Sequence, residues 1–175
     1  MAQRTKDAVD SALAGEPDML VVLAPGSMGT DIVNVVRAKR GSGIAIYMLS
    51  IISGDDLLRG AGLANSLGVV ISQALPFPGN INMAIMRAYM ADLKKYAPEA
   101  TPAYTSLEGY IGARVLYEAL RKAGAKPTRQ DVLAKLNALG KLDVGDLQVN
   151  YSRDQKAGNK AVDITMVSRG GKLIR

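Results

Sequence analysis

The chain has 175 residues, of which 48% are hydrophobic and 5% aromatic, and its formal net charge is +6. It contains no cysteine and no histidine, which excludes disulfides, thiolate nucleophiles, zinc sites with nitrogen or sulfur ligands and Ser–His–Asp triads. The cations are scattered over predicted helix ends rather than interleaved with aromatic residues, so we predict no nucleic-acid partner.

The first part of the chain is predicted to alternate helices and strands. The expected elements are a helix over 4–14, a strand over 18–24, a loop over 25–29 (PGSMG), a helix over 30–40, a strand over 44–49, a loop with a short helix over 50–60 and a strand over 69–75. The strands are continuous apolar runs, which is typical of parallel strands covered on both faces. This pattern predicts an α/β fold with a Rossmann-like parallel sheet flanked by helices.

The pattern changes after the third strand, which runs into Pro76 and Pro78. Proline restricts φ and donates no backbone hydrogen bond, so a stiff linker is expected there. The elements expected beyond it are helices over 81–97, 106–122 and 128–139, strands over 147–151 and 161–168, and a turn at 170–171. Thr105 and Glu108 have the spacing of a capping box. The three helices have apolar faces but no parallel strands between them, so they pack either on the first sheet or on a sheet that this chain lacks.

A resemblance to a known family rests on three stretches of the sequence. These are LGVVISQALPFP with the helix after it, AYTSLEGYIGARVLYEALRKAGAKPTRQDVLAKLNAL, and LQVNYSRDQKAGNKAVDITMVSRGGK. Together they resemble the C-terminal half of the periplasmic solute-binding proteins of ABC transporters, of the branched-chain amino-acid (Leu/Ile/Val) binding type.

The resemblance implies a type I periplasmic-binding-protein-like fold, in which two α/β lobes joined by crossovers hold a ligand in the cleft between them. Residues 1–75 would then be part of the C-terminal lobe, and 76–80 a hinge linker. Residues 81–155 would be helices and a strand on the N-terminal-lobe side, and 156–175 the return crossover strand into the C-terminal lobe. The sheet of the N-terminal lobe has no counterpart, so we expect a fragment with an incomplete two-lobe architecture.

The resemblance also implies a function. The chain would be the solute-binding component of an ABC transporter, taking a small polar ligand such as an amino acid and delivering it to an ABC permease in the periplasm, with no enzymatic role, catalytic residue, metal or cofactor. The first 17 residues lack the apolar core of a signal peptide, so the periplasmic location rests on the resemblance alone. With a lobe missing, the helical faces would stay exposed, which predicts a homo-oligomer or a domain-swapped dimer hinged at the proline linker.

Candidate site residues follow from the rule that open α/β sheets bind ligands beyond the carboxyl ends of their strands. The ligand-binding candidates are Pro25, Gly26, Ser27, Ser50, Ile52, Ser53, Gln73 and Tyr104. Each has a structural alternative: an ordinary strand-to-helix turn at 25–27, an N-cap at Ser53, a backbone partner for Gln73, and simple packing for Tyr104. In the family, the loop that matches 50–53 can contact a ligand ammonium, sometimes through an acid, and no acid lies there in this chain.

A second function stays open at this point. PGSMG, between a predicted strand and a predicted helix, could hold a phosphate in a Rossmann-like enzyme or a nucleotide-binding domain. The segment lacks the Lys-Ser/Thr ending of a P-loop, and the chain lacks a GxGxxG fingerprint. We therefore rank this alternative below the solute-binding function.

Overall fold

The computed structural model describes residues 2–151, 158 and 162–175, which form two compact units. Unit 1 comprises Met1–Gln73 and Val162–Arg175, and unit 2 comprises Ala74–Ala161. These limits lie close to the expected boundaries at 75 and 156; the assignment of the units to two receptor lobes stays a prediction. None of the described helices has the length and apolar content needed to cross a lipid bilayer.

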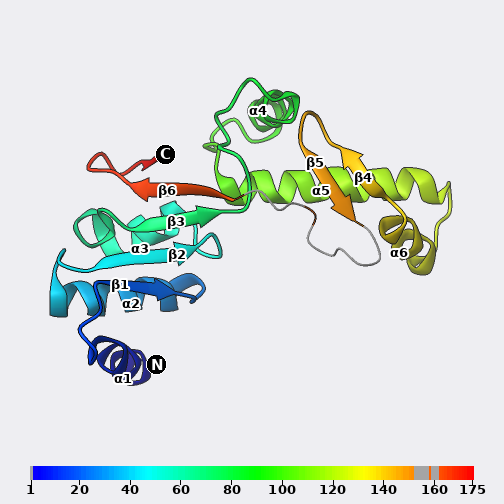
Figure 1. Ribbon diagram of the computed structural model, residues 1–175. Helices are drawn as coiled ribbons and strands as arrows, with labels where there is room; N and C mark the ends of the chain where they lie inside the picture. The colour runs from blue at the N-terminus through cyan, green and yellow to red at the C-terminus, as the bar shows by residue number, and fades with distance from the viewer. Residues whose placement is uncertain (1, 152–157, 159–161) are drawn as a thin grey trace. The chain divides into compact units, whose positions relative to one another are not determined.

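Unit 1 is a five-stranded sheet with three helices. Its elements are α1 (Ala2–Leu13), β1 (Met19–Val22), α2 (Gly26–Arg40), β2 (Ala45–Leu49), α3 (Gly54–Ser66), β3 (Val70–Gln73), β6 (Asp163–Val167) and β7 (Leu173–Ile174). The strand order is β1-β2-β3-β6-β7, and Figure 1 shows β1, β2, β3 and β6 side by side in this order. The first three strands are parallel, as predicted, and β6 joins β3 antiparallel.

Two helix boundaries in unit 1 differ from the sequence prediction. Helix α2 begins at Gly26 rather than at residue 30, so the predicted loop at 25–29 is wrong beyond Pro25. Helix α3 extends to Ser66 because it continues past a kink at Gly62, whose φ of 73° is outside the helical range. Its start is as expected: the Ser53 hydroxyl accepts a hydrogen bond from the amide of Asp56, which is the geometry of an N-cap.

One face of the sheet forms the core of unit 1. The buried strand residues include Val22, Ile46, Met48, Ile71 and Val167, and they pack with Val9 of α1, Val33 and Val36 of α2, and Leu57 and Ala61 of α3. These strand residues occupy alternate positions, so they point to the same face. All three helices of unit 1 therefore contribute to one layer on one side of the sheet.

The opposite face of the sheet, here called the open face, is apolar and exposed. It carries two rows of side chains paired across the strands, Val21–Tyr47–Val70–Met166–Ile174 and Leu49–Ser72–Ile164. Val21 is 61% exposed and Ile164 is 51% exposed. The expectation that the sheet is covered on both faces is thus wrong for the described chain, because its helical segments in unit 1 all pack on the other side.

Arg37 fastens the end of α2 to the rest of unit 1. Its guanidinium donates hydrogen bonds to the carbonyl oxygens of Asn65 at 3.1 Å, Gly41 at 3.0 Å, Ile44 at 2.8 Å and Leu67 at 3.4 Å. Partial burial lowers its pKa from the ordinary value, but an arginine remains protonated in proteins. The sequence predicts a solvated cation at this helix end. In the structure, the planar guanidinium of Arg37 instead donates to four carbonyl oxygens.

Unit 2 contains three helices and a two-stranded sheet. Its elements are α4 (Ala84–Tyr96), α5 (Tyr104–Ala123), α6 (Arg129–Asn137), β4 (Gly140–Asp143) and β5 (Gln148–Tyr151). Strands β4 and β5 pair antiparallel. The sequence predicts β5, as the strand over 147–151, but it does not predict β4. Val144, Leu147 and Val149 of this hairpin share a core with Met86 of α4 and Leu107 of α5. The helices thus pack on one another and on this hairpin rather than on the first sheet, while Leu116, Tyr117 and Leu120 of α5 stay exposed.

The starts of α4 and α5 involve contacts distant in sequence, whereas α6 starts at a local capping box of Thr128 and Asp131. The capping box expected at Thr105 and Glu108 is wrong, because α5 already begins at Tyr104, after Ala103. The Tyr89 hydroxyl accepts a hydrogen bond from the amide of Ala103 at 3.1 Å, which supports this earlier start. Helix α4 receives its cap from Asp146, whose carboxylate accepts from the Ala84 amide at 2.8 Å.

The linker between β3 and α4 was expected to be stiff and extended, but it contains a tight turn at residues 77–80. The amide of Asn80 donates to the carbonyl of Phe77 at 2.9 Å, and the tightness of this turn leaves no room for a Cβ at residue 79 beside the Phe77 ring. Leu75, expected in the third strand, instead belongs to the core of unit 2. Strand β3 therefore ends at Gln73.

We predict that Arg37→Lys lowers the free energy of unfolding by about 2 kcal/mol, because a lysine cannot bond several carbonyl groups at once and leaves some of them without a donor. The measurement is urea unfolding followed by circular dichroism. Arg40→Lys is the matched control, since Arg40 lies exposed in the same helical turn. Equal stability of the two variants would contradict the role assigned to Arg37.

Candidate functional site

The candidate site lies at the edge of unit 1 where the parallel strands β1, β2 and β3 end. Parallel strands present their carboxyl ends at the same edge of a sheet, and the segments that follow them meet there. Residues 25–27 follow β1, residues 50–53 follow β2, and Gln73 ends β3. The structure therefore brings seven of the eight predicted site residues to one edge.

The first turn of α2 supplies exposed backbone amides. Pro25 is the N-cap, and a proline side chain has no acceptor that could bond the amides of the first turn. Pro25, Gly26 and Ser27 are all exposed, and Gly26 takes a positive φ of 51°. These amides, at the positive end of the helix dipole, could bind an anionic group such as a carboxylate.

Gly29 allows this turn to lie tightly against the end of β2. A Cβ on residue 29 would lie 2.9 Å from the carbonyl oxygen of Ala24, 3.1 Å from Met48 and 3.3 Å from Ile52. The first of these is backbone, which cannot move aside as a flexible side chain would. From the sequence, Gly29 is expected only to be part of a loop. Its packing role depends on Met48 and Ile52, which lie far from it in the sequence.

The segment after β2, residues 50–53, offers fewer side chains to a ligand than the sequence predicts. Ile52 is 1% exposed and belongs to the core of unit 1, so its side chain packs and does not reach a ligand. The Ser53 hydroxyl caps α3 and also donates to the carboxylate of Asp56 at 2.7 Å. The structural alternative for Ser53 is therefore confirmed. Ser50 remains half-buried at the strand end.

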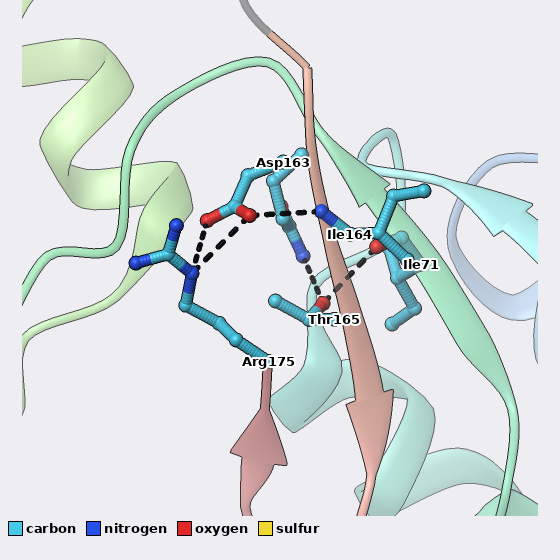
Figure 2. A network of polar contacts seen from close by, with 6 residues as sticks. Ile71, Asp163, Ile164, Thr165 and Arg175 are labelled. Atoms are coloured by element: carbon cyan, nitrogen blue, oxygen red, sulfur yellow. Dashed lines mark hydrogen bonds and ion pairs between the residues drawn. The ribbon is translucent and has the colours of Figure 1, made fainter.

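Gln73 belongs to a buried polar network between β3 and β6. Its side-chain amide donates to the Thr165 hydroxyl at 3.1 Å, and this hydroxyl donates to the carbonyl of Ile71 at 3.1 Å. Figure 2 shows the bond between Thr165 and Ile71 crossing from one strand to the next. Gln73 is 3% exposed, so it holds the strands together and does not present its side chain to solvent.

An ion pair that the sequence analysis did not single out lies at the same edge. Asp163 begins β6 opposite Gln73, and its Oδ2 lies 3.0 Å from Nε of Arg175 (Figure 2). The alternation in AVDITMVS contained the signal, since it places Asp163 and Thr165 on one face and Ile164 and Met166 on the other. Only the antiparallel pairing with β3 brings this carboxylate to the edge where the parallel strands end.

Tyr104, the eighth predicted residue, belongs to unit 2 and begins α5. Its ring is half-buried, and its centroid lies 6.4 Å from that of Phe77. Its role in a ligand site stays a prediction. Across residues 2–151, 158 and 162–175, no three carboxylates gather closely enough to hold a metal ion.

The sequence and the fold both match known proteins. The profile of a family described as periplasmic binding protein matches residues 5–172. An extracellular ligand-binding receptor from Verminephrobacter eiseniae has a TM-score of 0.85 at 24% identity, and the match covers 100% of this chain and 49% of the receptor. A substrate-binding periplasmic protein from Ralstonia solanacearum has a TM-score of 0.82 at 28% identity, with 96% of this chain and 48% of that protein covered.

A third solved structure widens the comparison. A possible leucine/isoleucine/valine-binding protein from Rhodopirellula baltica has a TM-score of 0.84 at 20% identity, and the match covers 97% of this chain and 46% of that one. The chain thus spans about half the length of the structures that it matches. No functionally curated protein matches the sequence.

We predict that Gly29→Ala destabilises unit 1 by about 1–3 kcal/mol, because the new Cβ forces the first turn of α2 away from the carbonyl of Ala24. Amide chemical shifts at residues 26–28 should move as the turn shifts. Gly15→Ala is the control, since a Cβ there meets nothing within 4 Å. A Gly29→Ala protein with unchanged stability and spectra would show that this close approach is not required.

Proposed function

The chain belongs to the periplasmic binding protein family, and on this premise we propose that it binds a small polar solute at the edge of unit 1 where β1, β2 and β3 end. The observation that carries the proposal is the match of the family profile over residues 5–172, nearly the whole chain. The match agrees with the resemblance inferred from the three sequence stretches.

The chemistry of the edge supports an anionic group on the solute. Three side chains at this edge already have structural roles: Ser53 caps α3, Gln73 joins β3 to β6, and Ile52 packs in the core. What remains exposed is the first turn of α2, with the amides of Gly26 and Ser27 at the positive end of the helix. We infer that a carboxylate of the solute binds these amides.

An amino acid is the proposed solute class. The similar structures include one named a possible leucine/isoleucine/valine-binding protein and one, from Thermotoga maritima, named a leucine-binding protein. The segment 50–53 contains no acid that could pair with the ammonium group, so that group would need a partner elsewhere. We therefore extend the proposal to other small carboxylates.

The proposed partner is an ABC permease, and the family implies a periplasmic or extracellular location. A solved structure from Aeropyrum pernix with the same fold is named an ABC transporter substrate-binding protein, which supports this partner. Members of this family bind solutes, and we propose no catalytic step. The nucleotide-binding alternative ranks lower, because PGSMG lacks the Lys-Ser/Thr ending of a P-loop and the chain lacks a GxGxxG fingerprint.

We predict that the chain alone binds leucine only weakly, with a dissociation constant above the micromolar range. One edge offers about half of the hydrogen bonds that a ligand enclosed on two sides would receive, and it leaves the ligand in contact with water. Titration followed by amide chemical shifts should move the signals of Gly26 and Ser27 with leucine. Leucinamide, which lacks the carboxylate, should not move them.

Ser27→Ala is the matched control for this titration, because it removes the hydroxyl and keeps the backbone amide. It should bind leucine as the parent chain does. A response to nucleotides alone would contradict the proposed function. A submicromolar dissociation constant for an amino acid, measured by calorimetry, would contradict the predicted weak binding.

A further inference from the structure

Asp163 and Arg175 lie at the same edge of unit 1 as the candidate site, and the proposed function does not use them. Strand β7 runs antiparallel to β6, and β6 runs antiparallel to β3, so β7 ends toward the same edge as the parallel strands. Arg175 directly follows β7. The rule that places ligands beyond the carboxyl ends of parallel strands therefore applies to Arg175 as well.

The guanidinium of Arg175 lies on the side of the sheet that carries the helices. Asp163, with which it pairs, points to the same face as the buried Thr165, because side chains alternate along β6. The start of α3 is next to β7, since an added Cβ at Gly54 would lie 2.8 Å from Cδ1 of Leu173. Arg175 is therefore close to the segment that follows β2.

The ion pair leaves the outer edge of the guanidinium unused. Nε of Arg175 lies 3.0 Å from Oδ2 and 3.2 Å from Oδ1 of Asp163, so both carboxylate oxygens share one N–H group (Figure 2). The other two nitrogens, Nη1 and Nη2, form no hydrogen bond with any residue that the structure describes. The side chain of Asp163 is 18% exposed and that of Arg175 is 58% exposed. A largely buried carboxylate thus holds an exposed guanidinium by its inner nitrogen.

We propose that Nη1 and Nη2 of Arg175 bind a second anionic group of the solute, which makes the solute a small dicarboxylate. This inference rests on the proposed function, in which a first carboxylate binds the amides of Gly26 and Ser27. A planar guanidinium matches a carboxylate through two parallel hydrogen bonds. Asp163 is a positioning residue, because it fixes the orientation of the guanidinium through Nε and does not itself touch the solute.

The acids near this edge favour an anion over an ammonium group at the second position. The segment 50–53 contains no acid, and the carboxylate of Asp163 is already paired with Arg175. The carboxylate of Asp56 accepts a hydrogen bond from Arg59 at 2.9 Å. Asp55, in the first turn of α3, is exposed and could instead attract an ammonium group, so the test below includes a zwitterion.

The spacing along the edge sets a minimum length for the solute. The first turn of α2 lies against the end of β2, because Gly29 packs on Met48 and Ile52. Strand β3 separates β2 from β6, so about 10 Å lies between these two strands. A hydrogen bond of about 3 Å at each end leaves at least about 4 Å between the carboxylates. We therefore expect several methylene groups between them, as in adipate.

The test titrates the full chain with adipate and with hexanoate, which has the same number of carbon atoms and only one carboxylate. Adipate should move the NMR signals of the Gly26 amide and of the Arg175 Nε–H group, and hexanoate should move only the Gly26 signal. Adipate should bind at least about tenfold more tightly, because it forms a second charge-assisted pair. 6-Aminohexanoate, with an ammonium group in place of the second carboxylate, should bind no more tightly than hexanoate.

Arg175→Gln should abolish the preference for adipate, and Arg169→Gln is the matched control. Arg169 is exposed in the turn between β6 and β7, at the opposite edge of the sheet, and its replacement changes the net charge equally. The control variant should therefore keep the preference. The Nε–H signal of the parent chain tests the same contact without any substitution, so the result does not depend on the folding of a variant.

Each contrary outcome has its own meaning. Equal affinities for adipate and hexanoate, with the Gly26 signal moving in both titrations, would overturn the second anion position and leave the proposed function intact. A preference for adipate that persists in Arg175→Gln would assign it to another cation. Tighter binding of 6-aminohexanoate than of adipate would assign the second position to an acid such as Asp55. If no carboxylate moves the Gly26 signal, the proposed function fails, and this inference fails with it.

Discussion

Strand β6 returns to unit 1 after the whole of unit 2 and pairs antiparallel with β3. Thr165 and Gln73 bond to each other inside this pairing, and Thr165 also bonds the carbonyl of Ile71, which satisfies polar groups in a buried place. A slip by one residue would move Thr165 to the open face and bring Ile164 or Met166 into the core. The register of this one strand pair therefore determines which side chains are buried and makes one sheet from two distant segments.

The same pairing decides where the polar and apolar surfaces of unit 1 lie. The core side of the sheet is closed by three helices, and its burial of aliphatic side chains is the main favourable term for folding. The other side continues the apolar character of the strands without any helix over it. In the described residues, this layered α/β unit with one helical layer therefore folds around one core and presents a second hydrophobic surface.

The candidate site shows how few of its groups are available for binding. Ser53 caps α3, Gln73 bonds Thr165, and Ile52 is buried in the core. The first turn of α2 differs, because Pro25 supplies no acceptor to its amides and Gly29 lets the turn lie against Ala24 and Met48. The binding chemistry at this edge thus depends on backbone groups whose position is set by a glycine.

The sequence by itself determined the alternation of helices and strands in unit 1, the parallel order of β1 to β3, the N-cap at Ser53 and the family, because these depend on local apolar runs, capping residues and short motifs. Tertiary structure decided the remainder. Helix α5 begins before the apparent capping box because Tyr89 bonds Ala103, and α4 is capped by Asp146, far away in the sequence. Which face of the sheet is covered, and which site residues are already occupied, likewise depend on contacts between distant segments, which local patterns do not encode.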